Sequence, residues 1–231
     1  MIKNFIKSNF PGFVHLINRT YNHLYHLRFY GKNRIHVFSS IYKKNQWDDA
    51  ESISGPGSTL QNTMLIRNAL PQIISKYKIK TMLDIPCGDF NWIQKIDLSQ
   101  ISYTGMEFVP DLIKSNTLKF GGENRKFMVA DLVEDKLPKS DLIFCRDCLV
   151  HLSYRDIQAA LANMKKSQST FLLTTSFTDH PNFDIVTGNW RQINLQANPF
   201  NLPRPLEIVN EGETGENKDK SMALWSLQDL T

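Results

Sequence analysis

The sequence predicts a single α/β domain built on a doubly wound, mostly parallel sheet of seven strands. Short apolar runs alternate with segments of helical periodicity between residues 81 and 174, which is typical of such a sheet. Three of these runs end at a carboxylate, namely Asp84, Glu107 and Asp131. Two more runs, 206–210 and 222–227, are joined by a polar loop and predict an antiparallel hairpin at the sheet edge, with an antiparallel last strand.

Composition limits the class of protein. A length of 231 residues with 41% hydrophobic and 22% charged residues suits one globular domain with a full core. No stretch approaches the roughly 20 apolar residues of a membrane span, and the first residues lack the apolar centre and cleavage site of a secretory signal. The sparse cysteines, Cys87, Cys145 and Cys148, suit a reducing compartment better than a disulfide framework. We expect a cytoplasmic protein, with peripheral contact to a membrane left open.

Residues 1–46 differ from the rest of the chain and are expected to form a helical extension to a domain spanning 47–231. They hold eight Lys or Arg, no Asp or Glu, and nine aromatic residues, whereas the remainder carries four net negative charges. Apolar spacing over 13–29 is close to helical, and Gly31 ends it. Two interpretations remain: a cap that packs its aromatic face on the domain, or a surface that docks on a membrane, an anionic polymer or a partner protein.

A turn-rich connector, 47–58, precedes an expected amphipathic helix over 59–76. Ser58 or Thr59 is its expected cap, and Pro71 is expected to kink or split it. The connector ends in Ser-Gly-Pro-Gly-Ser, which is either a flexible entry to the helix or a site where free backbone N–H groups bind a carboxylate or phosphate.

The central part then predicts a regular series of elements. Strands are expected at 81–84, 103–108, 126–130, 141–145 and 170–174, and helices at 91–96, 110–120 and 154–166. Parallel strands place their carboxyl ends at one edge, where open α/β sheets bind ligands.

Four short motifs lie at these strand ends. They are Asp-Ile-Pro-Cys-Gly-Asp at 84–89, Gly-Met-Glu at 105–107, Ala-Asp-Leu at 130–132 and Arg-Asp-Cys-Leu-Val-His at 146–151. In this order and spacing they resemble the loops of class I S-adenosylmethionine-dependent methyltransferases. The resemblance covers about residues 50–228 and implies S-adenosylmethionine as the cofactor.

The resemblance implies a role for each strand-end loop. The first loop would wrap the methionine part of the cofactor with Asp84, Pro86, Gly88 and Asp89. Glu107 would accept both ribose hydroxyls, as a carboxylate can from a vicinal diol.

The next two motifs complete the implied cofactor site. Asp131 would accept from the adenine amino group, with Leu132 against the ring, and Arg146 of the fourth motif is counted with the cofactor-binding residues. The first loop departs from the glycine-rich pattern of the family, because Pro86 and Phe90 stand where glycines are usual. This shifts part of the binding to three further residues: Ser54, Gly55 and Trp92.

Catalysis is expected after the fourth strand. Methyl transfer from a sulfonium is an in-line displacement, so the enzyme positions the acceptor and, for a hydroxyl, removes its proton. His151 is the candidate base, and Asp147 would bind the acceptor, orient His151 or act as the base itself. Cys145, Cys148 and His151 supply at best three zinc ligands, so no metal is expected.

The acceptor is expected against the long segment after the fifth strand. Amide groups, an arginine and indole rings suit a polyhydroxylated ligand, so O-methylation of a sugar or similar polar small molecule is preferred, within surface glycan synthesis. The candidate substrate-binding residues are Thr175, Trp190, Arg191 and Asn194.

Other functions were compared on the same motifs. Methylation of RNA or protein, and a partner-binding protein on a methyltransferase scaffold docked through 1–46, remain alternatives. The loop at 86–91 lacks the Gly-x-Gly-x-x-Gly pattern of a dinucleotide site, and Asp89 would repel a pyrophosphate, which argues against a dehydrogenase.

Overall fold

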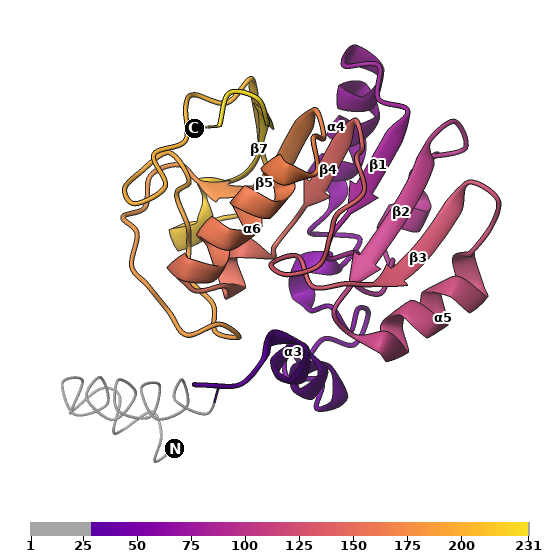
Figure 1. Ribbon diagram of the computed structural model, residues 1–231, viewed down its shortest axis with the longest axis horizontal. Helices are drawn as coiled ribbons and strands as arrows, with labels where there is room; N and C mark the ends of the chain where they lie inside the picture. The colour runs from indigo at the N-terminus through magenta and orange to yellow at the C-terminus, as the bar shows by residue number, and fades with distance from the viewer. Residues whose placement is uncertain (1–28, 231) are drawn as a thin grey trace.

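A computed structural model describes residues 29–230 of the chain. Its centre is a seven-stranded sheet in the order β3-β2-β1-β4-β5-β7-β6 (Figure 1). The strands are β1 (Thr81–Asp84), β2 (Ser102–Glu107), β3 (Arg125–Val129), β4 (Leu142–Cys145), β5 (Phe171–Phe177), β6 (Glu207–Asn210) and β7 (Lys220–Ser226).

The pairing confirms the predicted fold class. The first five strands pair in parallel, and β7 runs antiparallel to both β5 and β6. The closing hairpin therefore joins the sheet through its second strand, which lies between β5 and β6. The chain order reverses between β1 and β4, and such a switch point is where open α/β sheets bind ligands.

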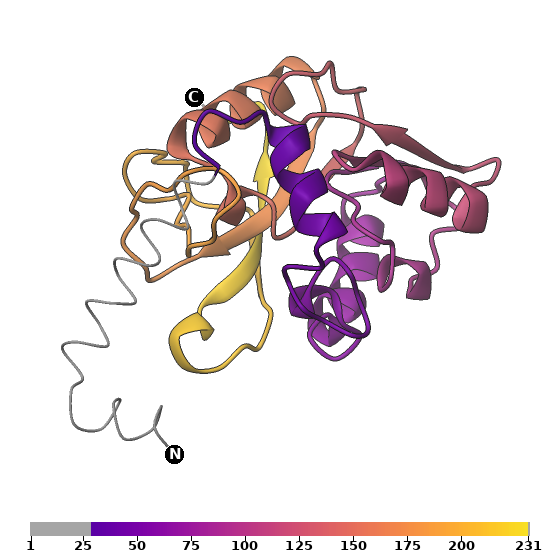
Figure 2. The ribbon, with the colours of Figure 1, turned by 90° about the horizontal axis from the view of Figure 1, so that it is seen from below.

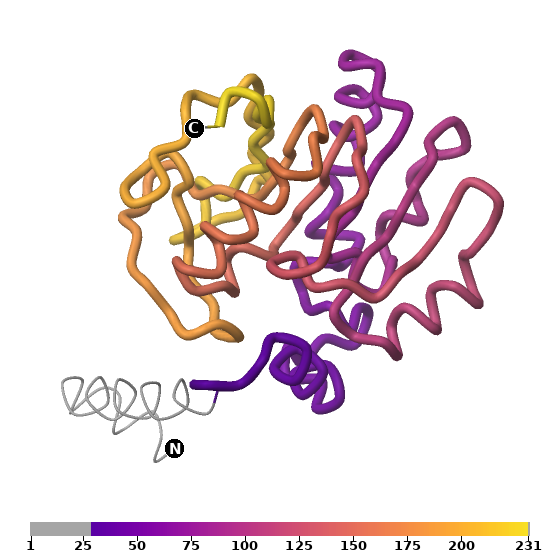
Figure 3. The backbone as a smooth tube through the Cα atoms, viewed as in Figure 1, coloured from indigo at the N-terminus to yellow at the C-terminus, as the bar shows by residue number. Residues whose placement is uncertain are grey.

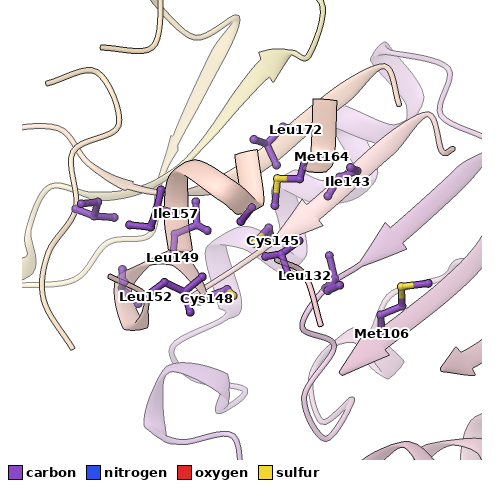
Figure 4. Close-up of a cluster of buried hydrophobic side chains, with 14 of the residues drawn as sticks. Met106, Leu132, Ile143, Cys145, Cys148, Leu149, Leu152, Ile157, Met164 and Leu172 are labelled. Atoms are coloured by element: carbon purple, nitrogen blue, oxygen red, sulfur yellow. The ribbon is translucent and has the colours of Figure 1, made fainter. Parts of the chain in front are cut away.

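Helices cover both faces of the sheet. They are α3 (Arg34–Lys43), α4 (Met64–Lys76), α5 (Pro110–Phe120) and α6 (Tyr154–Lys166), with short 3₁₀ turns η1 (Pro56–Ser58), η2 (Ile93–Lys95), η3 (Leu149–His151) and η4 (Gly215–Asn217). Successive side chains of a strand point to opposite faces, so Met82 packs with α4 and Leu83 with α6. Figure 4 shows the second of these clusters, where Met164 of α6 lies near Ile143 of β4 and Ile157 lies near Leu149.

Three details differ from the expected helices. Helix α4 begins at Met64 rather than 59, because residues 59–63 form turns in which the Thr63 hydroxyl donates to the Thr59 carbonyl. Pro71 lies inside α4 and does not split it. The helix expected over 91–96 is only the 3₁₀ turn η2.

The extension also differs from expectation where it is described. The helix predicted over 13–29 lies outside residues 29–230, and α3 was not expected, although Asn33 caps it by accepting from the N–H of His36 at 2.8 Å. Val37 and Phe38 of α3 are buried in the core. Figures 1, 2 and 3 place α3 beside the edge where the parallel strands end. The boundary expected at residue 46 stays a prediction.

Within the described chain, no helix is long and apolar enough to span a bilayer. The same residues contain no group of three or more His, Cys, Asp or Glu arranged to hold a metal ion.

Candidate functional site

A cavity of about 340 Å³ opens at the carboxyl ends of β1, β2 and β4. Its walls come from segments far apart in the sequence, including α3, the loop at 54–58, and the ends of β5 and β7 that meet there. Of the expected cofactor-binding residues, nine line it: Ser54, Gly55, Asp84, Pro86, Gly88, Asp89, Trp92, Glu107 and Arg146. Its volume is in the range of small-molecule sites.

The loop after β1 is held against the 52–54 segment. Gly88 has φ +54°, and a Cβ there would lie 2.5 Å from the Ser54 Oγ, so a side chain fits neither the backbone nor the space. The Asp89 N–H donates to the same Oγ at 2.9 Å. Glycine is therefore required at position 88 because the Ser54 side chain lies too close for any larger residue.

The Asp89 carboxylate joins the loop after β1 to the 52–53 segment by hydrogen bonds. Its Oδ2 accepts from the Ser52 hydroxyl at 2.8 Å and from the Ile53 N–H at 3.1 Å, and its Oδ1 accepts from the Asn91 N–H at 3.1 Å. Asp89 lines the cavity, but these three bonds use most of its acceptor capacity. Its contribution to the site is to fix the two loops that frame the entrance.

Two buried carboxylates line the cavity without an ion-pair partner among residues 29–230. Asp84 is 2% exposed and accepts from the Tyr103 hydroxyl at 2.6 Å. Burial raises its pKa to about 8, which the Tyr103 bond only partly opposes. Burial likewise raises the pKa of Glu107 to about 7, against the Phe108 and Gly88 N–H groups that bind its two oxygens at 2.7 and 3.2 Å.

A network of charged side chains lies at the same cavity. Lys220 Nζ lies 2.9 Å from Asp147 Oδ2, 3.0 Å from Glu213 Oε1 and 3.3 Å from Glu211 Oε2. Arg146 donates from Nε to Glu211 Oε1 at 2.6 Å and lies 3.2 Å from Asp147 Oδ2. Two basic and three acidic groups thus form one network, with a net charge of about −1 when all are ionised; four of the five line the cavity, and Glu211 lies behind them.

This network sets the state of Asp147. Burial alone would raise the pKa of Asp147, but the charges of Lys220 and Arg146 outweigh it and lower the pKa to about 2. Asp147 has φ +52°, a left-handed conformation that is rare outside glycine and is found at functional sites. Its carboxylate is ionised across the physiological range and is a poor proton acceptor there. Of the roles left open for Asp147, the geometry favours binding or orienting.

His151 lines the cavity and is held in one tautomer. Its Nδ1 lies 2.8 Å from the carbonyl oxygen of Asn189, which can only accept, so Nδ1 carries the proton and Nε2 keeps its lone pair. Burial lowers the pKa of His151 below its ordinary value. The ring also packs at 5.6 Å between centroids against Trp47.

Two expected cofactor residues lie elsewhere. Neither Asp131 nor Leu132 lines the cavity, and Leu132 is fully buried. The Asp131 carboxylate instead binds Arg34 Nε, at 2.8 Å through Oδ2 and 3.0 Å through Oδ1. Phe38 of α3 stacks on Phe108 at 5.0 Å between centroids, and both rings line the cavity beside Val109.

The expected substrate residues are mostly structural. Trp190 lines the cavity and is 47% exposed. Thr175 is buried and its Oγ1 accepts from the Asp147 N–H at 2.8 Å. Asn194 donates to the Thr178 carbonyl at 3.0 Å, and Arg191 is fully buried. The last three do not line the cavity.

The sequence reasoning missed Lys220, Glu211 and Glu213. The acidic loop at 211–216 before a lysine at the start of β7 was a local signal for charge, but no pattern linked it to Asp147, 73 positions earlier. Phe38 was also missed as a cavity residue, since the extension was treated apart from the domain, and Trp47 was missed because it lies in a connector with no recognisable motif.

Solved structures share this fold. A Leishmania major SAM-dependent methyltransferase matches with a TM-score of 0.60 and 12% identity over 80% of this chain and 82% of that one. The N-methyltransferase NodS from Bradyrhizobium japonicum WM9, in complex with S-adenosylhomocysteine, matches with a TM-score of 0.57 and 16% identity over 84% and 98%. Magnesium protoporphyrin IX methyltransferase from Synechocystis PCC 6803, with bound SAM, matches with a TM-score of 0.55 and 13% identity over 85% and 98%.

No family model matches the sequence, and no curated protein matches it. The structural similarity identifies the fold as that of class I methyltransferases, as the motifs predicted. At these identities the similarity establishes the fold alone, and the chemistry has to be argued from the cavity.

Proposed function

We propose that the chain is an S-adenosylmethionine-dependent methyltransferase that methylates a hydroxyl of a sugar or similar polar small molecule. The observation that carries the proposal is the cavity at the switch point, where two buried carboxylates without a cation face a wall that holds a neutral imidazole. A cationic cofactor would supply the positive charge that the carboxylates lack. An acceptor hydroxyl would supply the proton that the imidazole can take.

The residues present fit the cofactor. Asp84 and Glu107 would become fully ionised beside an α-ammonium group and a ribose diol, which lowers the free energy that their burial costs. Arg146 Nη2 is buried and has no hydrogen-bond partner within residues 29–230, so it is a free donor for the cofactor carboxylate. When bound, the cofactor supplies a methyl group activated on a sulfonium.

The adenine is assigned to the apolar end of the cavity. Phe108, Val109 and Leu112 form a wall there that follows directly after Glu107, the proposed ribose ligand. Asp131 keeps its sequence-based role only if it releases or shares Arg34. The proposal therefore needs no polar contact from Asp131 to the base.

His151 and Asp147 divide the acid–base work. The Nε2 lone pair of His151 would take the proton of the acceptor hydroxyl as its oxygen attacks the methyl group. Asp147, held ionised by Lys220, would accept a hydrogen bond from the acceptor and orient it. A hydroxyl needs such a base far more than a neutral amine does, which supports an O-directed reaction.

The acceptor wall suits a polyhydroxylated molecule. Trp190 offers an exposed indole face, and Glu213 and Asn217 add acceptors and an amide at the same wall. A pyranose has an apolar ring face and a rim of hydroxyl groups, so it matches a wall that combines an aromatic ring with hydrogen-bonding groups.

Two measurements test the proposal. Calorimetry with S-adenosylmethionine and S-adenosylhomocysteine should give micromolar binding that Glu107→Ala weakens strongly, because the ribose loses its acceptor. A screen of nucleotide sugars and glycan fragments, read by the mass of one added methyl group, should then identify the acceptor. Unchanged cofactor binding in Glu107→Ala would sink the ribose assignment.

A second proposal concerns docking through the extension. On the described part of this segment, Tyr30 is 76% and Ile35 40% exposed, beside exposed Lys32, Lys43 and Lys44. Such a basic, aromatic surface suits an anionic membrane or an acidic partner. Lys32→Glu, Lys43→Glu and Lys44→Glu together should leave cofactor binding intact and reduce sedimentation with anionic vesicles; unchanged sedimentation would argue against docking.

A further inference from the structure

We infer that Arg191 is a positioning residue for His151: it fixes the turn that carries the imidazole, and with it the contact between His151 Nδ1 and the Asn189 carbonyl. The inference rests on the proposed function, in which His151 is the base. It assigns to Arg191 a role different from the substrate contact expected from the sequence.

Within residues 29–230 the guanidinium of Arg191 donates its hydrogen bonds to backbone carbonyls, and its Cζ lies 5.9 Å from the centroid of the Tyr154 ring. Its Nη1 and Nη2 donate at 2.8 Å each to the oxygens of Leu149 and Leu152, on either side of His151. Its Nε donates to the Phe183 oxygen at 3.3 Å. The Leu149 and Leu152 side chains lie in the buried cluster of Figure 4, so these carbonyls are in a region from which water is largely excluded.

The backbone around Arg191 holds the same turn. The Gly188 N–H donates to the His151 carbonyl at 2.8 Å, and the Arg191 N–H donates to the Val150 carbonyl at 3.1 Å. Asn189 supplies the carbonyl that fixes the His151 tautomer. Residues 149–152 are therefore all held by the segment 188–191: Gly188 and Asn189 bind His151, and Arg191 binds the other three.

Gly188 shows that this segment is held from its other side. It has φ +103°, and a Cβ there would lie 2.4 Å from a Val37 methyl group and 2.8 Å from the Phe29 ring. The segment is thus packed between the start of α3 and the His151 turn. A displacement of Arg191 has little room to be absorbed except by the turn itself.

Electrostatics gives Arg191 a second effect on His151. Burial lowers the pKa of His151, and the positive charges of Arg191 and Lys220 lower it further, while Asp147 and the Asn189 carbonyl raise it. Lys220 is paired with carboxylates, whereas the guanidinium of Arg191 makes no ion pair within the described part of the chain. Burial lowers the pKa of Arg191 to about 10, while Tyr154 and Asp184 raise it, so the guanidinium stays charged at neutral pH.

The test reads His151 directly and needs no acceptor. Labelled histidine in the full chain gives the pKa and the tautomer of His151 by ¹⁵N and ¹³C NMR titration, with the signal assigned from His151→Gln. Arg191→Met should raise the pKa of His151, because a positive charge near the imidazole is removed, and should mix its tautomers. Arg155→Met is the matched control, since that arginine is on α6 with a 91% exposed side chain, and it should leave both unchanged.

Arg191→Lys keeps the inference testable if the methionine variant does not fold. Lysine retains the charge but cannot span three carbonyls, so we expect a low His151 pKa with mixed tautomers. A folded Arg191→Met protein with the wild-type pKa and tautomer would overturn the inference, as would Arg191→Lys with an undisturbed tautomer. Full methyl transfer by His151→Gln would instead refute the base, and leave the Arg191 result standing.

Discussion

Asp84→Asn should abolish the pH dependence of stability that the buried carboxyl group imposes. Asparagine is isosteric, cannot ionise, and keeps an oxygen that accepts from the Tyr103 hydroxyl. In the wild type without ligand, burial raises the pKa of Asp84 from 3.8 to about 8. The native state therefore binds the proton more tightly than the unfolded chain, and stability falls as pH rises between these two values.

The size of the effect follows from the shift. Each unit of pKa difference corresponds to about 1.4 kcal/mol, so ionisation costs the wild type on the order of 5 kcal/mol at pH 8 and about 2 kcal/mol at pH 5. The unpaired amide of the variant costs about 1–3 kcal/mol at any pH. The stability of Asp84→Asn relative to wild type should therefore increase by about 3–4 kcal/mol from pH 5 to pH 8.

Urea unfolding of both proteins at pH 5, 6, 7 and 8, without ligand, measures this difference. The same pair should differ in calorimetry with S-adenosylhomocysteine, where the variant loses roughly 10- to 100-fold in affinity, because a charge-assisted hydrogen bond is replaced by a neutral one. A difference in stability that does not change with pH would refute the buried, cation-free carboxylate. Equal affinity would remove Asp84 from the ammonium site.

Three further predictions concern other parts of the site. His151→Gln should lower methyl transfer by about 10²- to 10⁴-fold and abolish the acidic limb of the pH–rate profile. Unchanged cofactor affinity in calorimetry is the control. Full activity would contradict the assignment of His151 as the base. Gly88→Ala should weaken cofactor binding, because its Cβ would lie 2.5 Å from the Ser54 hydroxyl oxygen. Gly215→Ala is the control: this residue also has a positive φ, but nothing lies within 4 Å of its Cβ position, so cofactor binding should be normal. Equal binding by the two variants would argue against a tight loop. Lys220→Met should lower the free energy of unfolding in urea by about 3–5 kcal/mol, because it removes a partner of buried carboxylates. Lys218→Met, at an exposed lysine, should change this free energy little. Similar values for the two variants would mean that the network is well solvated.

The strand ends could be predicted from the sequence because their signals are local. Apolar runs that end at Asp84 and Glu107 identify buried parallel strands, and the order of strands follows from right-handed crossovers and short connections. The structure accordingly brings both carboxylates to one cavity with Arg146, Asp147 and His151.

The remaining contacts depend on long-range packing that local patterns do not encode. Lys220 reaches Asp147 because β7 pairs with β5, and Arg34 reaches Asp131 across 97 positions because α3 packs on the core. Arg191 was expected to face a ligand because a guanidinium beside amides and an indole suits a polyhydroxylated molecule, but here backbone carbonyls satisfy it inside the protein. Residue type indicated charge in each case, and only the fold determined its partner.

The count of protons released when S-adenosylhomocysteine binds tests the central claim most directly. At pH 7.5, with pKa values of about 8 for Asp84 and about 7 for Glu107, the free protein holds about one proton on this pair. A bound ammonium group and ribose diol favour both ionised forms. Calorimetry in two buffers of different ionisation enthalpy should therefore show release of about one proton per ligand, and less from Asp84→Asn. No binding at millimolar ligand, or binding without proton release, would contradict the assignment of this cavity to S-adenosylmethionine.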